Sequence, residues 1–195
     1  MQYHTNIIIF LIYILRVASI GAFMQDYYWR DYSPGETPYD AIEVANDGKY
    51  IGQVYVTGGL IPAMIYSHLG YAVAELYGKQ VIKENIKILC CPDHTKLFWD
   101  YVDFDRSSSA QGGLMKNAIS GGFHKDVGRV FIGKVYHEDE WKVGKVISIE
   151  NIYNGLIIWK NSDGTALSPV KQFYMLKYNS TTAGGDIVTC DAISR

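Results

Sequence analysis

The sequence predicts an all-β fold of antiparallel sheets, built from two tandem repeats that pack about a pseudo-twofold axis. First, residues 50–55 (YIGQVY) return as residues 131–136 (FIGKVY), 81 positions later. Second, short β-rich segments alternate with Gly, Pro, Asn and Asp turn signals, and no long window shows a helical apolar period. Third, the 195 residues include 16 Tyr and 19 Gly, which favour strands and tight turns. A unit that recurs in this way indicates a fold made by duplication.

The first repeat spans residues 27–91. It opens with an aromatic segment, and a turn follows at residues 33–35 (SPG). In the body of the repeat we expect a hairpin turn at residues 57–59 (TGG) and strands at residues 50–56, 70–74 and 81–89.

The second repeat spans residues 97–178. Its Trp99 corresponds to Trp29 of the first repeat, and we expect both rings in the core, with stacking on a sugar ring as the alternative. Turns are predicted at residues 137–140 (HEDE) and 161–164 (NSDG), and a flexible loop is predicted at the insertion of residues 103–113. Each repeat alone is too small to bury a good core, so the two should pack together.

The two ends of the chain are expected to lie outside the repeats. Residues 1–22 are typical of a signal peptide, because an apolar run at residues 7–15 leads into small residues, and this predicts a secreted, extracellular protein. A signal anchor and a buried N-terminal helix are the alternatives. Arg16 cuts the run short of the roughly 20 residues that span a bilayer, so we expect no stable membrane insertion. Residues 179–195 form a polar tail, which begins with an N-glycosylation acceptor pattern at Asn179.

Charge and motifs argue against several classes of function. The formal net charge is −2 and no basic stripe is present, so we expect no nucleic-acid partner. The sequence carries no recognised catalytic, cofactor or metal-binding motif, which predicts a protein that is not an enzyme and needs no cofactor or metal. The cysteines are Cys90, Cys91 and Cys190. Either Cys190 bridges to one of the other two, or all three stay free, since a bridge between adjacent residues would be strained.

The repeats resemble the DM9 (DM-nine) repeat, which occurs in secreted insect and mollusc proteins, in mannose-binding lectins and in the lectin half of natterin toxins. The second copy resembles it best, at residues 117–124 (NAISGGFH), 130–138 (VFIGKVYHE) and 144–146 (GKV). The first copy matches at residues 39–42 (YDAI), 46–47 (ND), 50–55 (YIGQVY) and 61–64 (IPAM). The resemblance covers residues 28–178, and it implies a carbohydrate-binding domain without catalytic activity.

In members that bind mannose, the resemblance implies a site made by an Asp after the Gly-Gly-aromatic segment and by the Lys of Pro-Gly-Lys. A carboxylate accepts hydrogen bonds from vicinal sugar hydroxyls, and an ammonium group donates to them. The first repeat keeps Asp47 but has Met64 in place of the Lys, and the second keeps Lys145 but has His124 in place of the Asp. Either one composite site survives between the repeats, or both sites are damaged.

Each of the implied site residues also has an ordinary structural interpretation. Asp47 precedes a glycine in a turn, Lys145 could be a solvated residue at a strand end, and His124 could be a surface turn residue. We expect a secreted protein that recognises carbohydrate, such as mannose-type glycans on microbial surfaces, and that gains strength as a homodimer. The alternative is a non-catalytic structural or protein-interaction module, with a protein partner and a decayed sugar site.

Overall fold

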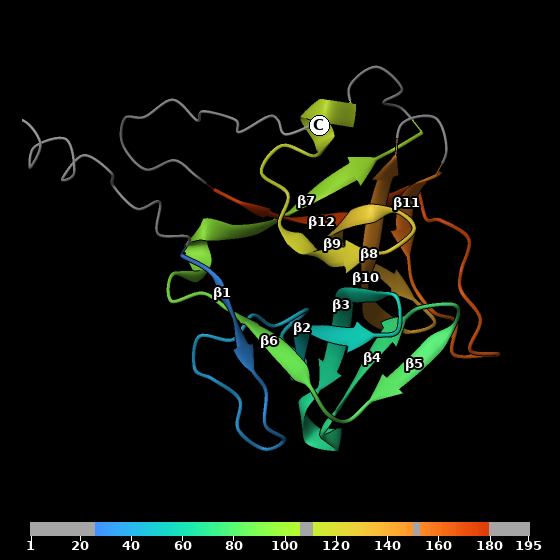
Figure 1. Cartoon of the computed structure of the whole chain (residues 1–195). Coiled ribbons are helices and arrows are strands. Elements are labelled where there is room, and N and C mark those ends of the chain that lie inside the picture. The colour runs from blue at the N-terminus through green and yellow to red at the C-terminus, as the bar shows by residue number, and fades with distance from the viewer. Residues whose placement is uncertain (1–25, 106–110, 150–152, 180–195) are drawn as a thin grey trace, which may run out of the picture.

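The computed structural model describes residues 26–105, 111–149 and 153–179, and strands dominate these ranges (Figure 1). The first half of the fold contains β1 (Tyr28–Asp31), β2 (Lys49–Val56), β3 (Gly59–Tyr66), β4 (Tyr71–Glu75), β5 (Lys79–Ile82) and β6 (Ile86–Cys90). The second half contains β7 (Leu97–Asp103), β8 (Ser120–His124), β9 (Gly128–His137), β10 (Glu140–Ile149), β11 (Tyr153–Ile157) and β12 (Gln172–Tyr178). The helical segments are short: η1 (Ser67–Leu69), η2 (His94–Lys96) and α2 (Gln111–Leu114). The predicted all-β fold is confirmed.

The strands form one hydrogen-bonded sheet in the order β1-β6-β2-β3-β8-β9-β10-β11. From this path β4 and β5 continue beside β3, and β12 joins β7 to β9. All of these strand pairs are antiparallel, as predicted. In Figure 1 the first half lies below the second, and the halves meet where β3 pairs with β8, with Gly59 opposite His124. The two predicted repeats, residues 27–91 and 97–178, enclose these two sets of strands.

Equivalent hydrogen bonds in the two halves support the duplication. The amide of Ile42 donates to the carbonyl of Leu89 (2.9 Å), and the amide of Ile119 donates to the carbonyl of Leu176 (3.0 Å). Ile42 and Ile119 each precede the repeated strand, while Leu89 and Leu176 lie on the closing strands β6 and β12. The same residue types therefore make the same backbone contacts in each repeat.

The buried core has three apolar clusters, and the middle one is shared by the halves. It includes Ile51, Met64 and Leu89 from the first half together with Ile132 and Trp159 from the second. The other two clusters lie mainly within the first half and wholly within the second half, respectively. Burial of the shared cluster therefore depends on the packing of the two repeats against each other. Trp29 and Trp99 are partly buried and pack against it, as expected for core rings.

Local structure differs from the sequence-based expectation at two places. Residues 81–89 form the end of β5 and most of β6 rather than one strand, because Asn85 takes a left-handed conformation between them (φ 55°). The insertion of residues 103–113 contains the start of the helical turn α2, while residues 106–110 lie outside the described residues. The hairpin turn at residues 137–140 forms as predicted, with positive φ at both Glu138 (51°) and Asp139 (62°).

Several expectations about the chain ends lie outside the described residues. These are the signal peptide (1–22), Cys190 and the polar tail beyond Asn179. Cys90 and Cys91 are both buried and do not bridge to each other. Within the described ranges, no helix is both long enough and apolar enough to cross a bilayer.

Candidate functional site

Asp47 and Lys145, which the sequence suggested as a composite pair, have separate partners. The Asp47 carboxylate lies in the loop before β2, where it accepts a hydrogen bond from the Lys49 ammonium group (2.9 Å). Lys49 also lies 3.5 Å from a carboxylate oxygen of Glu140, which comes from the second half. Among the hydrogen bonds and ion pairs of the described residues, none joins Asp47 to Lys145.

Lys145 lies in β10 and is buried rather than solvated. Its Nζ atom donates to Glu75 twice, at 2.5 Å to the carboxylate and at 2.7 Å to the backbone carbonyl. Both side chains are nearly inaccessible, and Glu75 belongs to the first half. Lys145 thus forms a buried ion pair that connects the second half to the first.

His124 is also buried, at 5% exposure, although the pattern around it favoured a surface turn residue. His124 lies in β8 between β3 and β9, and its ring contacts Tyr77 edge-on, with 6.0 Å between the ring centres. Nδ1 of His124 accepts a hydrogen bond from the amide of Asp126 (3.2 Å). Burial, together with the positive charge of Lys145, lowers the pKa of His124 below its ordinary value. The neutral form of the ring is therefore favoured.

A second contact between the halves, equivalent to the buried ion pair, is made by apolar side chains. Met64 corresponds to Lys145 in the repeated hairpin. Trp159 lies two residues past the β11 partner of Lys145, just as Glu75 lies two residues past the β4 partner of Met64. Met64 and Trp159 are fully buried in the shared cluster. The charged pair and the apolar pair therefore occupy equivalent places about the pseudo-twofold axis.

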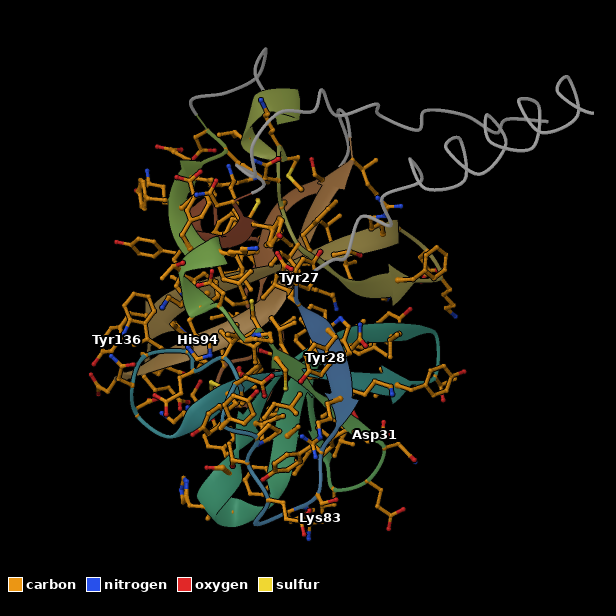
Figure 2. The ribbon with its side chains drawn as sticks, turned by 90° about the vertical axis from the view of Figure 1, so that its left-hand side faces the viewer. Tyr27, Tyr28, Asp31, Lys83, His94 and Tyr136 are labelled. Carbon is orange, nitrogen blue, oxygen red and sulfur yellow. The ribbon has the colours of Figure 1, made fainter. Side chains whose placement is uncertain are left out.

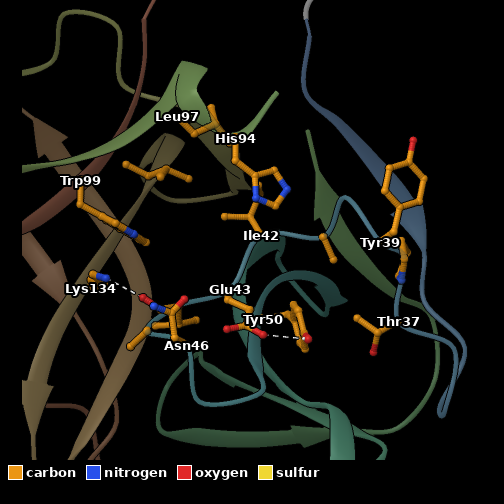
Figure 3. Close-up of a pocket in the computed structure, with 15 residues that line it drawn as sticks. Thr37, Tyr39, Ile42, Glu43, Asn46, Tyr50, His94, Leu97, Trp99 and Lys134 are labelled. Atoms are coloured by element: carbon orange, nitrogen blue, oxygen red, sulfur yellow. Dashed lines mark hydrogen bonds between the residues drawn. The ribbon is translucent and has the colours of Figure 1, made fainter. Parts of the chain in front are cut away.

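A pocket of about 780 Å³ opens beside the Asp47 loop, between residues 37–50 of the first half and strands β7 and β9 of the second half (Figure 3). Its polar lining includes Glu43 and Asn46, and its aromatic lining includes Trp99. The Glu43 carboxylate accepts a hydrogen bond from the Tyr50 hydroxyl (3.0 Å). Asn46 takes a left-handed conformation (φ 55°), which an Asn tolerates better than most residues.

Lys134 forms part of the pocket wall. Its Nζ atom lies 4.3 Å from the centre of the Trp99 ring and 4.9 Å from the centre of the Trp141 ring, and it donates to the carbonyl of Val44 (2.5 Å). Burial lowers the pKa of Lys134 to about 8, although the negative charge of Asp47 opposes this shift. Ordinary exposed lysines have a pKa of about 10.4.

Lys134 has an uncharged counterpart in the first half, Gln53. The Gln53 side-chain amide donates to the carbonyl of Gly121 (2.8 Å), while Lys134 donates to the carbonyl of Val44. In each repeat, a side chain of the repeated strand, β2 or β9, thus donates a hydrogen bond to a carbonyl of the other repeat. Sequence reasoning did not select Lys134, although its place in the repeated motif, where the first copy has Gln, was a usable signal. Asn46 belongs to the family match at residues 46–47 but was not selected as a site residue, and Glu43 carried no signal in the repeat.

The described residues contain no group of three or more His, Cys, Asp or Glu side chains arranged to hold a metal ion.

Comparison with known proteins places the chain in a family. The DM9 repeat family matches residues 43–157, which is more than half of the sequence. No curated protein matches. Among solved structures, the nematode sperm cell motility protein MFP2B is similar in fold, with a TM-score of 0.52 at 14% sequence identity. The match covers 80% of this chain and 48% of that chain, so this chain spans about half the length of that protein. The chain belongs to the DM9 repeat family.

Proposed function

We propose that this protein recognises carbohydrate, and that the pocket between the halves is its binding site. The observation that carries the proposal is the lining of the pocket, which brings Glu43 and Asn46 of the first half together with Trp99 and Lys134 of the second (Figure 3). Vicinal sugar hydroxyls need both acceptors and donors, and charge-assisted hydrogen bonds are the stronger ones. The C–H faces of a sugar ring pack against aromatic rings such as that of Trp99.

The ligand class and setting are part of the same proposal. We expect mannose-type glycans, as on microbial surfaces, because the family resemblance includes mannose-binding lectins. Asp47 follows Asn46 of the pocket lining and is proposed to contact the ligand at the rim. Lys145 and His124 are engaged with Glu75 and Asp126, so we assign them a positioning role. Single lectin sites bind weakly, so a homodimer would gain strength through multivalency.

The test is retention of the protein on mannan resin, with free mannose as competitor. Glu43→Gln keeps a partner for Tyr50 but removes the carboxylate charge, so we expect retention to weaken by about tenfold. Glu84→Gln is the matched control, because Glu84 is an exposed carboxylate in the turn between β5 and β6, and it should bind normally. If folded protein is not retained on mannan or on any other glycan resin, the proposal is wrong.

A second candidate function is that of a non-catalytic protein-interaction module. It is favoured by a row of aromatic rings in the second half. The order along the row is Tyr101, Tyr174, Trp141 and Tyr136, and the centres of neighbouring rings lie 5.5–5.7 Å apart. Tyr136 projects from the edge of the molecule in Figure 2, and Tyr101 is 55% exposed. Tyr and Trp are enriched at protein interfaces. Sedimentation of the wild type and of a Tyr101→Ser/Tyr136→Ser variant would test self-association through this row, and identical masses would exclude it.

We also propose an extracellular location, supported by the apolar run at residues 7–15. Expression in a secretory host, with sequencing of the N-terminus of the released protein, tests this directly. Release with a new N-terminus near residue 22 is expected, whereas retention in the cytosol would contradict it.

A further inference from the structure

The described residues include four buried lysines, and three of them have a carboxylate partner: Lys142 with Glu138, Lys145 with Glu75 and Lys177 with Asp100. The fourth is Lys134. No carboxylate of the described residues lies within ion-pairing distance of its Nζ atom, which contacts two indole rings and one backbone carbonyl instead. Among the four, Lys134 therefore differs in having no carboxylate of the described residues in ion-pairing contact with its amine, although Asp47 acts on it from farther away.

Lys134 is also the only one of the four that lines the pocket of Figure 3. An amine that is desolvated against apolar surfaces loses part of its preference for the charged form. The pKa of Lys134 is lowered to about 8 for this reason, so about a tenth of the amine carries a free lone pair at pH 7, far more than in an exposed lysine. Desolvation of this kind activates lysine amines toward carbonyl compounds.

We propose that the Lys134 Nζ atom condenses with an aldehyde held in the pocket and forms an imine. The nitrogen lone pair attacks the carbonyl carbon, and a proton moves from nitrogen to oxygen to give a carbinolamine. The oxygen then leaves as water after protonation by solvent, so that one amine and one aldehyde give one imine and one water. The ligand class is a small aldehyde, including the open-chain end of a reducing sugar. The inference uses the pocket of the proposed function but does not require that function to be correct.

The test uses the full-length protein with benzaldehyde and cyanoborohydride, which reduces an imine to a stable amine, followed by peptide mass mapping. We expect Lys134 to be labelled at least about tenfold faster than Lys83, an exposed lysine at the far tip of the first half (Figure 2). The Lys134→Gln variant mimics Gln53, so the hydrogen bond to Val44 can persist. This variant should lose the fast label while Lys83 labels as before. Equal labelling rates of Lys134 and Lys83 in the wild type would overturn the proposal.

Two sugars separate this inference from the carbohydrate proposal. Mannose has an open-chain aldehyde and should label Lys134, whereas methyl α-mannoside cannot open and should only slow labelling by benzaldehyde. Fast labelling that methyl α-mannoside does not slow would support the reactive amine and count against sugar binding. Retention on mannan without fast labelling of Lys134 would support sugar binding and refute the imine.

Discussion

The two halves of the molecule share a backbone plan but differ in the chemistry of the side chains between them. Gln53 and Lys134 make equivalent bonds to carbonyls of the opposite half, one with a neutral amide and one with an amine. Lys145 and Glu75 form an ion pair across the halves, and the equivalent pair about the pseudo-twofold axis is the apolar Met64 and Trp159. Duplication has therefore kept the strand pairing and the cross-half contacts, while single positions changed their charge.

At the buried ion pair and its apolar counterpart, the change between charged and apolar side chains affects both residues of the contact. A buried charge without a partner costs about 3–5 kcal/mol, whereas a buried ion pair and a well-packed apolar pair can be similar in stability. Each half contributes one member of the ion pair, and the equivalent position in the other half is apolar: Met64 for Lys145 and Trp159 for Glu75. The two members of each contact therefore differ together between the repeats: both are charged in one contact and both are apolar in the other.

The largest effect is expected when only one member of the ion pair is removed. Lys145→Met copies the residue of the first half but leaves the Glu75 carboxylate buried alone, so it should lower the free energy of unfolding by about 3–5 kcal/mol. Glu75→Gln in the same protein should recover much of this loss, because the amide can still accept from the backbone of Gly78. Chemical denaturation of the two single variants and of the double variant measures the coupling. If the two substitutions add independently, the ion pair does not join the halves as described.

The two halves also differ in the room for a side chain at equivalent positions of β3 and β10. Gly144 corresponds to Ala63, since each pairs with the glycine of the repeated motif, Gly133 or Gly52. A Cβ atom at Gly144 would lie 2.1 Å from the carbonyl oxygen of Ile157. Gly144→Ala should therefore cost about 3 kcal/mol through overpacking. The reverse change in the first half, Ala63→Gly, should cost only about 1 kcal/mol. Equal thermal midpoints for the two variants would contradict the difference in packing.

These contrasts also show what sequence could predict. The repeated motif, the turn at residues 137–140 and the strand-rich composition carry local information, and they predicted the antiparallel all-β fold correctly. The recurrence of Trp29 and Trp99 predicted their place against the core. Such features could be predicted because each depends on residues close together in the chain.

The candidate site could be predicted only in part, because it forms where the halves meet. Glu43 and Lys134 line one pocket although they lie in different repeats. The sequence allows Lys145 to be a sugar ligand or a solvated residue at a strand end, but it is buried in an ion pair with Glu75 of the other repeat. His124 is buried beside Tyr77, which also belongs to the other repeat. The partner of each residue depends on how the repeats pack, which no local pattern encodes.

A smaller effect, on the pH dependence of the free energy of unfolding, is expected because Lys134 can titrate whereas the equivalent Gln53 cannot. The folded-state pKa of Lys134 is lowered to about 8, whereas an unfolded lysine has a pKa of about 10.4. Between these values the unfolded state binds more protons, so the stability contributed at this position rises with pH. The wild type should gain about 2 kcal/mol relative to Lys134→Gln across that window, with a slope of at most about 1.4 kcal/mol per pH unit. Urea denaturation of both proteins at several pH values tests this, and parallel stability curves would contradict it.

The smallest effect is expected on the outer face, where the equivalent positions carry an ion pair in one half and an aromatic pair in the other. Asp31 and Lys87 pair across β1 and β6, with 2.7 Å between the Lys87 Nζ atom and a carboxylate oxygen of Asp31. Tyr101 and Tyr174 pair at the equivalent positions of β7 and β12, with 5.5 Å between their ring centres. An exposed ion pair contributes about 0–1 kcal/mol, because water screens it and two flexible side chains must be ordered. An aromatic pair contributes about 0.5–1.5 kcal/mol beyond its buried area.

Lys87→Ala should therefore change the free energy of unfolding by less than Tyr174→Ala, and its small effect should vanish in concentrated salt. The effect of Tyr174→Ala should persist in salt, because ring packing does not depend on charge screening. Denaturation of both variants at low and high ionic strength separates the two contributions. A larger or salt-resistant effect for Lys87→Ala would show that the ion pair on this outer face is more than a screened surface contact.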